Sequence, residues 1–432
     1  MPENRKPALG FIFITLLLDI TGIGIIVPII PKLITQLISS NLSNASLVGG
    51  WLMFSFAITQ FIFSPVLGNL SDRFGRRPVL LFSLFGYCIN YLIMGFAPTI
   101  GWLFTGRMLA GIMGASITTA TAYIADISTP EKRAQNFGIV GAAFGLGFII
   151  GPVIGGTLGH FGARVPFFAA AGLTFINWIY GYFVLPESLP KANRRKFELK
   201  RANPLGSLLL LKRYPVILAL VGAIICLYIA GHATQSTWTF YTMEVFKWNE
   251  SAVGLSLGYV GLLVAIVQGW LIRLINPRLG LKKTIFLGLI LYVIGFILIS
   301  VSSQGWMIFI FVVPFCLGGI AGPALQSIIS NQVPANEQGE LQGALTSLMS
   351  ASAIIGPVIM TSLFSYFTGK YAPFYLPGAP FLMGALLTLI SIGFVVRSFI
   401  SHPSQNIISN ISGKSKKDVN NDSKSEIFES IA

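Results

Sequence analysis

Charged residues are scarce in this chain of 432 residues, because Asp, Glu, Lys and Arg together make up only 10% of it. A soluble globular domain carries about 25% charged residues, so the composition excludes an ordinary water-soluble protein. Cysteine is rarer still, with 3 residues at no spacing typical of a disulfide framework or a metal site. Hydrophobic residues, in contrast, make up 54% of the chain, which is typical of an integral membrane protein.

Two kinds of chemical motif are also missing. No Gly-x4-Gly-Lys-Ser/Thr loop is present to hold the phosphates of ATP. The apolar segments contain no nucleophile paired with a base and no metal-ligand cluster. The sequence therefore predicts neither an ATP-driven pump nor an enzyme, and it calls for no metal and no bound cofactor.

Twelve apolar segments are long enough to cross a bilayer, which needs roughly 20 helical residues. They run approximately over 8–31, 47–69, 78–97, 101–124, 137–159, 165–185, 214–240, 251–272, 283–302, 305–330, 341–367 and 378–400. We expect an all-α membrane protein of twelve transmembrane helices in two pseudo-symmetric six-helix halves, which is how one large class of transporters is built.

Most of the 29 Lys and Arg residues fall in every second loop between the segments. Short cytoplasmic loops of membrane proteins carry such an excess of Lys and Arg. This pattern predicts that both termini are cytoplasmic, and it explains the net charge of +14 by contact with lipid headgroups, without nucleic acid. We expect an N-terminal half over 1–185, a cytoplasmic linker with a short surface helix over 186–213, a C-terminal half over 214–400, and a disordered tail over 401–432.

Asp19 is the only acidic residue well inside an apolar segment. An ionised group in the bilayer core costs several kcal/mol, so such a residue normally faces a protein interior or an aqueous cavity. Arg107 is a second charge within a segment, about 9 Å from its outer end at 1.5 Å per residue. We interpret Asp19 and Arg107 as a proton-coupling pair. An Arg107 that only caps carbonyls or extends to the interface is the alternative.

A tight loop between the second and third segments concentrates four charges around Gly75. Charges that pair across an interface that opens and closes would act as a gate. The alternative is that the charges only set the topology of the chain, which would explain the arginines but not Asp72. The predicted gating residues are Gly68, Asp72, Arg73, Gly75, Arg76 and Arg77, with Asp126 and Glu131 as partners at the inner end of the fourth segment.

The fifth segment is rich in glycine at four-residue spacing, which lets helix backbones touch. Pro152 removes one backbone donor and kinks a helix there. Close contact together with a kink favours a hinge between the two halves, and ordinary small-residue packing is the compatible alternative. The predicted hinge residues are Gly147, Gly151, Pro152, Gly155 and Gly156.

Isolated polar residues in other segments are candidates for lining a substrate cavity. Each one alone is also consistent with a hydrogen bond between helices. His232 is the only one of them that could titrate near neutral pH. The predicted cavity residues are Gln60, Asn90, His232, Gln235, Gln268 and Gln326.

With these residues in view, the chain resembles the major facilitator superfamily, and most of all its drug:proton antiporter branch, which contains the tetracycline efflux proteins. Gly68–Leu81 matches the signature loop of the superfamily, and Leu18–Pro31 resembles the first-span motif of the antiporter branch. Gly106–Gly111 resembles its fourth-span arginine motif, and Gly147–Gly156 the fifth-span motif of exporters. The resemblance covers roughly residues 8–400.

The resemblance implies proton coupling at Asp19 and Arg107, gating at the loop, and a monomer in the bacterial inner membrane. This chain differs from the tetracycline exporters at three positions. They carry an acid, a histidine and an acid where this chain has Asn90, Val264 and Tyr292. These differences leave the transporter interpretation intact but bear on the cargo and on the number of protons moved.

The sequence thus predicts a secondary transporter that exports a small amphipathic, drug-like compound in exchange for protons by alternating access, with tetracycline as one candidate. The proton gradient would supply the energy, and protons, cargo and lipid would be the partners. One alternative is an importer or exporter of a metabolite on the same fold. The other is a membrane sensor or scaffold that has lost transport. Such a protein is expected to lose its coupling and gating charges, whereas this chain has both sets.

Overall fold

The computed structural model describes residues 5–114, 116–128, 133–195, 214–334 and 337–401. The first part of the chain forms α1 (Arg5–Ile26), α2 (Ile30–Ile38), α3 (Leu42–Phe74), α4 (Arg76–Gly95), α5 (Ile100–Met113), α6 (Ser116–Ile127), α7 (Arg133–Leu158), η1 (Gly159–Phe161), α8 (Val165–Val184) and η2 (Lys191–Asn193). The second part forms α9 (Pro215–Phe246), α10 (Glu250–Ile266), the π-helical turn η5 (Val267–Leu271), α11 (Ile272–Ser300), α12 (Gly305–Gly318), α13 (Ala321–Asn331), α14 (Gln338–Thr368) and α15 (Ala379–Ser401). The predicted surface helix of the linker and the tail from residue 402 lie outside the described residues.

The described helices account for all twelve expected membrane crossings. Ten helical stretches are long and apolar enough to span a bilayer, and the bent pair α1–α2 makes an eleventh. One of the ten, Glu250–Ser300, has 51 residues. At 1.5 Å per residue this is more than twice the roughly 30 Å of a hydrocarbon core, so it holds two crossings. The predicted twelve-helix fold class is confirmed.

The structure differs from the expected loop between the eighth and ninth crossings. Instead of an irregular connection, the helix continues through Pro277 and changes direction at Gly280, whose φ of 75° is left-handed. Glycine adopts this backbone at no steric cost, so a sharp change of direction replaces a loop. The first crossing bends by 44° between α1 and α2, next to Pro28 and Pro31. A proline lacks the amide hydrogen that a continuous helix needs.

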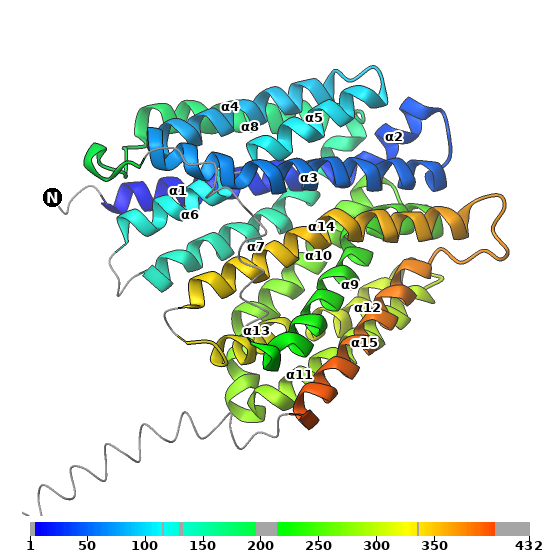
Figure 1. Cartoon of the computed structure of the whole chain (residues 1–432). Coiled ribbons are helices and arrows are strands. Elements are labelled where there is room, and N and C mark those ends of the chain that lie inside the picture. Colours follow the sequence, from blue (N-terminus) through cyan, green and yellow to red (C-terminus); the bar gives the residue numbers. More distant parts are fainter. Residues whose placement is uncertain (1–4, 115, 129–132, 196–213, 335–336, 402–432) are drawn as a thin grey trace, which may run out of the picture.

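The helices form two groups, α1–α8 and α9–α15, which meet along α3 with α14 and α7 with α10 (Figure 1). The groups lie close together where α3 begins and spread apart toward the end of α3 (Figure 1). We call the end that carries Asp72–Arg77 the basic end, and the end that carries Lys32 and Glu250 the opposite end.

The three largest of the four clusters of buried apolar side chains in the described residues follow this arrangement. One lies inside the first group around Phe11 and Tyr123, and a second lies inside the other group around Leu289 and Leu325. The largest cluster crosses between the groups and contains Leu33 of α2 together with aromatic side chains of α9, α14 and α15. Because this cluster lies toward the opposite end, apolar packing closes that end of the molecule.

Candidate functional site

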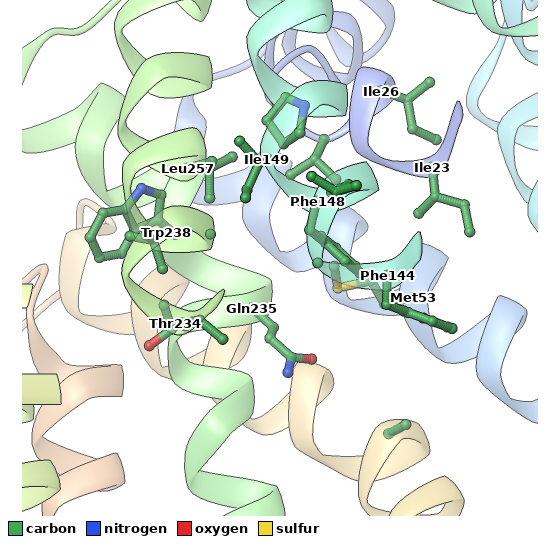
Figure 2. A pocket seen from close by; sticks show the side chains of 18 of the residues that line it. Ile23, Ile26, Met53, Phe144, Phe148, Ile149, Thr234, Gln235, Trp238 and Leu257 are labelled. Atoms are coloured by element: carbon green, nitrogen blue, oxygen red, sulfur yellow. The ribbon is translucent and has the colours of Figure 1, made fainter. Parts of the chain in front are cut away.

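A cavity of about 1110 Å³ lies between the two helix groups. Its wall is made by α1, α3, α4, α5 and α7 of the first group and by α9, α10, η5, α11 and α14 of the second. In the close view, Ile23 and Met53 lie across the open space from Gln235, which points into it (Figure 2). The wall is mainly apolar and aromatic, as in most small-molecule sites.

Five of the six predicted cavity residues lie on this wall: Gln60, Asn90, His232, Gln235 and Gln268. The structure places Gln326 elsewhere, on α13, where its Nε2 donates a hydrogen bond to Oε1 of Gln342 at 2.9 Å. Gln326 therefore joins α13 to α14 and does not line the cavity. A polar residue inside an apolar segment did not by itself reveal which way its side chain faces.

The charged groups on the wall are all basic among the described residues: they are Arg107 and Arg273, with no Asp or Glu. Arg107 has a buried Nε without a hydrogen-bond partner in the described part of the chain. Arg273 follows the π-helical turn that also carries Gln268. Such turns are frequent at functional sites.

Asp19 lies behind the wall and not on it. It is on α1, 6% exposed, and absent from the residues that line the cavity. Tyr91 of α4 does lie on the wall and interacts electrostatically with both Asp19 and Arg107. The two residues predicted to couple protons thus both lie near Tyr91, which the sequence analysis did not single out.

The predicted gating loop is held by Arg76 at the basic end. Its Nη1 lies 2.6 Å from Oδ1 of Asp72, and its Nε lies 3.2 Å from Oδ2 of Asp126. Its Nη1 also donates to Oγ of Ser71 at 2.5 Å. These contacts tie α3, α4 and α6 together, so they connect helices within the first group. Glu131 lies outside the described residues.

Glu187, which the sequence analysis did not single out, completes this cluster. Its Oε1 accepts a hydrogen bond from the backbone N of Arg76 at 2.9 Å, and its Oε2 lies 3.7 Å from Nη2 of Arg194. Gly75 has a φ of 107°, and a Cβ there would lie only 2.1 Å from Oε2 of Glu187. The dihedral favours glycine at position 75, and a side chain there would also have to displace the Glu187 carboxylate. The available signal was a lone acid directly after the sixth apolar segment.

The remaining arginines of the loop make separate contacts. Arg77 donates to the backbone oxygen of Tyr182 at 2.6 Å, which anchors the start of α4 to α8. Arg73 lies over the ring of Phe74 at 5.0 Å and is exposed. Gly68, which precedes the charges, has open space where a Cβ would be.

The predicted hinge residues on α7 face two different partners. A Cβ at Gly147, Gly151 or Gly155 would collide with α1, and at Gly155 it would lie 1.9 Å from the backbone oxygen of Ile25. A Cβ at Gly156 would instead lie 2.5 Å from the backbone oxygen of Glu250 in the other group. The backbone oxygen of Pro152 also faces α10, 2.3 Å from where a Cβ at Gly254 would be. Thus α7 is packed tightly on α1 and also meets α10.

At the opposite end, polar contacts join the two groups. Nζ of Lys32 lies 2.7 Å from Oε1 of Glu250, and the Glu250 side chain is only 9% exposed. Oγ of Ser251 donates to the backbone oxygen of Gly156 at 2.9 Å and lies 2.7 Å from Nε2 of His160. Oγ of Ser43 donates to the backbone oxygen of Ser365 at 2.7 Å.

A connecting segment at the same end is tied to α9. Oη of Tyr375 donates to Oε1 of Glu244 at 3.0 Å. Burial, followed by the neighbouring carboxylate of Glu244, raises the pKa of Tyr375 to about 12. Tyr375 therefore stays protonated and remains a donor at physiological pH.

Comparisons with known proteins agree with this architecture. The Major Facilitator Superfamily matches the chain over residues 12–279 and 273–410. The tetracycline resistance protein of class C from Escherichia coli is 38% identical over 383 residues, covering 89% of this chain and 95% of that protein. Multidrug resistance protein 2 from Bacillus subtilis (strain 168) is 31% identical over 392 residues, covering 88% and 94%.

Among solved structures, the chain is similar to a bacterial homologue of the human lysosomal transporter Spinster in an inward-facing and unoccupied conformation. The TM-score is 0.74 at 16% identity, and the match covers 93% of this chain and 98% of that one. At this identity the likeness concerns the fold.

Proposed function

The chain belongs to the major facilitator superfamily, and on this basis we propose that it exports a small amphipathic compound in exchange for protons. The observation that carries the proposal is a buried carboxylate, Asp19, behind a cavity between two helix groups that lie close together at the opposite end and spread apart at the basic end (Figure 1). A transporter of this kind binds its cargo near the bilayer midplane and exposes the site to each side in turn. It is not an enzyme.

The basic end would face the cytoplasm of a bacterial inner membrane. The excess of Lys and Arg in loops at this end supports that orientation, which also puts both termini inside. The contacts between Lys32 and Glu250 and between Ser43 and Ser365 would then close the outer side. In this state the cavity is ready to take cargo from the cytoplasm.

Proton exchange would occur at Asp19. A carboxyl group that is 6% exposed is more stable neutral, whereas a nearby cation or water favours the ionised form. Movement of the two helix groups changes how far water reaches toward Asp19, so it changes which form is favoured. Asp19 would bind a proton from the outer side and release it to the cytoplasmic side.

The cavity wall supports a neutral, zwitterionic or acidic cargo over a simple organic cation. Its charged groups, Arg107 and Arg273, are basic, and no described Asp or Glu lies on it. The amides of Gln60, Gln235 and Gln268 offer hydrogen bonds in an otherwise apolar surface. Tetracycline, a flat and oxygen-rich amphipathic molecule, fits these groups. It is also the compound in the name of the relative that is 38% identical.

Gating would rest on Arg76 and its partners. At the basic end Arg76 holds the ends of α3, α4 and α6 in a fixed arrangement through Asp72 and Asp126. A group of helices that is locked internally can move as one body, which alternating access requires. We expect the chain to act as a monomer, because both helix groups and the cavity belong to one polypeptide.

Drug susceptibility in an efflux-deficient bacterial host tests the proposal. The host would express the wild-type chain, the Asp19→Asn variant or an empty vector, and tetracycline would be tested beside a panel of structurally different drugs. We expect the wild type alone to raise the inhibitory concentration of tetracycline, because the Asn side chain cannot bind and release a proton. Glu244→Gln, which removes a carboxylate near the opposite end, is the matched control and should behave as wild type.

The possible results separate the candidate functions. Resistance that survives Asp19→Asn would remove the coupling role of Asp19. No shift for any compound, with the protein present in the membrane, would overturn drug export and favour a metabolite carrier on the same fold. Resistance to other drugs but not to tetracycline would retain drug export and change the cargo.

A further inference from the structure

Arg273 is a cation on the cavity wall that lacks a counter-ion. It is exposed, it lines the cavity, and its guanidinium makes no ion pair or hydrogen bond with the part of the chain that the structure describes. Arg76 at the basic end, in contrast, is paired with two carboxylates, those of Asp72 and Asp126. Setting the topology of the chain explains a basic residue at this end but not its place in a cavity. The position of Arg273 therefore indicates a partner that enters the cavity from solution.

The other arginine on the wall, Arg107, is placed differently. Its side chain is half-buried, its Nε is buried, and it interacts electrostatically with Tyr87 and Tyr91 of α4. Arg107 is thus engaged within the first helix group. Arg278, the next arginine of α11, is exposed but does not line the cavity. Among the described residues, Arg273 is therefore the guanidinium that a bound compound can reach.

Two amides lie on the same side of the cavity as Arg273, on the second helix group. Gln268 is on the π-helical turn just before α11, and Gln235 of α9 points into the open space (Figure 2). Both are exposed, and neither side chain has a hydrogen-bond partner among the residues that the structure describes. Amides and a guanidinium offer several N–H donors, whereas an ionised carboxylate only accepts hydrogen bonds. These three groups therefore suit an acidic group on the cargo.

The cavity is apolar far from Arg273. Leu257 also lines it and lies 16 residues earlier in the chain, which corresponds to about 24 Å along a helix. Leu257, Trp238 and Ile26 all line the cavity and belong to the apolar cluster that closes the opposite end, or pack against it. The cavity thus has an apolar part toward the opposite end and an exposed cation toward the basic end.

We propose that Arg273 determines the specificity of the cavity by binding the acidic group of an amphipathic organic anion, such as an aromatic carboxylate. This inference rests on the function proposed above and narrows its cargo. A guanidinium can donate two parallel hydrogen bonds to one carboxylate, a geometry that other cationic side chains do not offer. The amide of Gln268 adds a further donor, and the apolar body of the cargo lies toward Leu257 and Trp238.

The charge of the wall also favours entry of an anion. No described Asp or Glu lines the cavity, and clefts lined by charge of one sign with apolar walls concentrate the potential of that charge. In the orientation proposed above, the cavity takes cargo from the side of the basic end, so an entering compound meets Arg273 before it reaches Leu257. An acidic group therefore remains near Arg273 while the apolar body moves deeper.

Equilibrium binding to the purified full chain tests the inference. The probes are nalidixic acid and 1-pyrenebutyric acid, each compared with its own primary amide, which has nearly the same shape without the charge. We expect the wild type to bind each acid more tightly than its amide. Arg273→Gln should weaken the Kd of the acids roughly fivefold, between the effects of an exposed ion pair and of a hydrogen bond to a buried charge. The Kd of the amides should stay within twofold of wild type.

Two further variants show which property of Arg273 matters. Arg273→Lys keeps the charge but loses the paired donors, so its preference for the acids should be intermediate. Arg278→Gln removes an exposed arginine of the same helix from outside the cavity and is the matched control. It should bind acids and amides as the wild type does.

Salt dependence adds a readout that a change in packing would not move. Between about 0.01 M and about 1 M salt the Debye length falls from about 30 Å to about 3 Å, so an accessible ion pair weakens. In the wild type the acids should lose affinity over this range while the amides do not. In Arg273→Gln the acids should become as insensitive to salt as the amides. The wild-type measurement keeps the test decisive if Arg273→Gln does not fold.

Three results would overturn the inference. They are equal affinity of the wild type for acid and amide, an unchanged preference for the acids in Arg273→Gln, and an equal loss of that preference in Arg278→Gln. The last would mean that Arg273 acts only as one of many basic charges at this end. If any of these occurs while the wild type still raises the inhibitory concentration of tetracycline, the inference fails and drug export stands. If the chain confers no resistance but binds acids through Arg273, the proposed function fails and the anion site stands.

Discussion

Lys32 and Glu250 form an ion pair with 2.7 Å between Nζ and Oε1, although they are separated by more than half of the chain. Lys32 lies on α2 of the first helix group, and Glu250 is the first residue of α10 in the second. Carbon atoms of the Glu250 side chain also lie within 3.4 Å of where a Cβ at Gly159 would be. The pair thus spans the contact that closes the opposite end of the molecule.

Breaking this pair should favour the state in which the opposite end is open. Glu250→Gln removes the charge while keeping the size of the side chain, and it leaves Lys32 without its counter-ion. A partly exposed pair contributes on the order of 1 kcal/mol, which corresponds to roughly a fivefold change in the equilibrium between the two states. Gln36 and Tyr371 are both exposed at that end and can carry spin labels. The distribution of distances between the two labels should shift to longer values in Glu250→Gln.

The matched control for this prediction is the pair of Lys247 and Glu244, whose charged atoms are 3.7 Å apart within one helix turn. Lys247→Gln removes a charge at the same end without touching the contact between the groups or the hydrogen bond of Tyr375 to Glu244, so the label distances should not change. Restoring the pair in reversed order, with Lys32→Glu and Glu250→Lys together, should return them toward wild type. An unchanged distribution in Glu250→Gln would show that this pair does not hold the end closed.

Arg76 is expected to control the rate of transport more than the affinity for cargo. Arg76→Ala removes the contacts with Asp72, Asp126 and Ser71 that tie three helices together, but it touches no residue of the cavity wall. The turnover number in proteoliposomes should fall severalfold while KM changes by less than about twofold, because the residues that bind the cargo are unchanged. Arg397→Ala, which removes an exposed arginine on α15 outside the predicted gating residues, is the control. A rise in KM with unchanged turnover would contradict the gating role.

Much of this architecture follows from the sequence because a bilayer leaves few solutions. Every backbone group in the hydrocarbon core must be satisfied internally, so an apolar segment of sufficient length becomes a helix. The twelve segments and the position of Asp19 within the first of them could therefore be read directly. The change of direction at Gly280 could not be predicted, because a polar, basic stretch of sequence is compatible both with a loop and with a continuous helix that is broken at a glycine.

The site was less predictable, because burial and pairing depend on distant parts of the chain. Gln326 and Gln235 are alike as polar residues in apolar segments, yet one joins α13 to α14 and the other points into the cavity. Tyr91 carries no signal of its own, since an aromatic residue is common in a membrane helix. Its place is set by the fold, which brings the Tyr91 hydroxyl to 3.0 Å from where a Cβ at Gly22 of α1 would be.

The packing of α7 on α1 predicts opposite effects for two glycines of one helix. At Gly155 a Cβ would lie 1.9 Å from the backbone oxygen of Ile25, so Gly155→Ala forces the helices apart. Such overpacking costs about 1–3 kcal/mol. At Gly145 nothing lies within 4 Å of the Cβ position, and Gly145→Ala should stabilise the helix by about 0.5–1 kcal/mol.

Thermal unfolding in detergent measures both variants. The melting temperature should fall by several degrees for Gly155→Ala and should be equal to or slightly above wild type for Gly145→Ala. Equal behaviour of the two variants would mean that the α1–α7 contact tolerates separation and does not fix the position of α7.

Gln235 provides the most direct test of the cavity itself. Its side chain points into the open space, so Gln235→Ala removes a hydrogen-bonding group without opening a packed core (Figure 2). A hydrogen bond contributes about 0.5–1.5 kcal/mol net, which predicts a two- to tenfold weaker Kd for tetracycline, measured by equilibrium binding to the purified protein. Gln326→Ala removes the same chemical group from outside the cavity and should leave Kd unchanged. Equal effects of both substitutions would place the cargo away from this wall, whereas an effect of Gln235→Ala alone would locate it between α9 and α7.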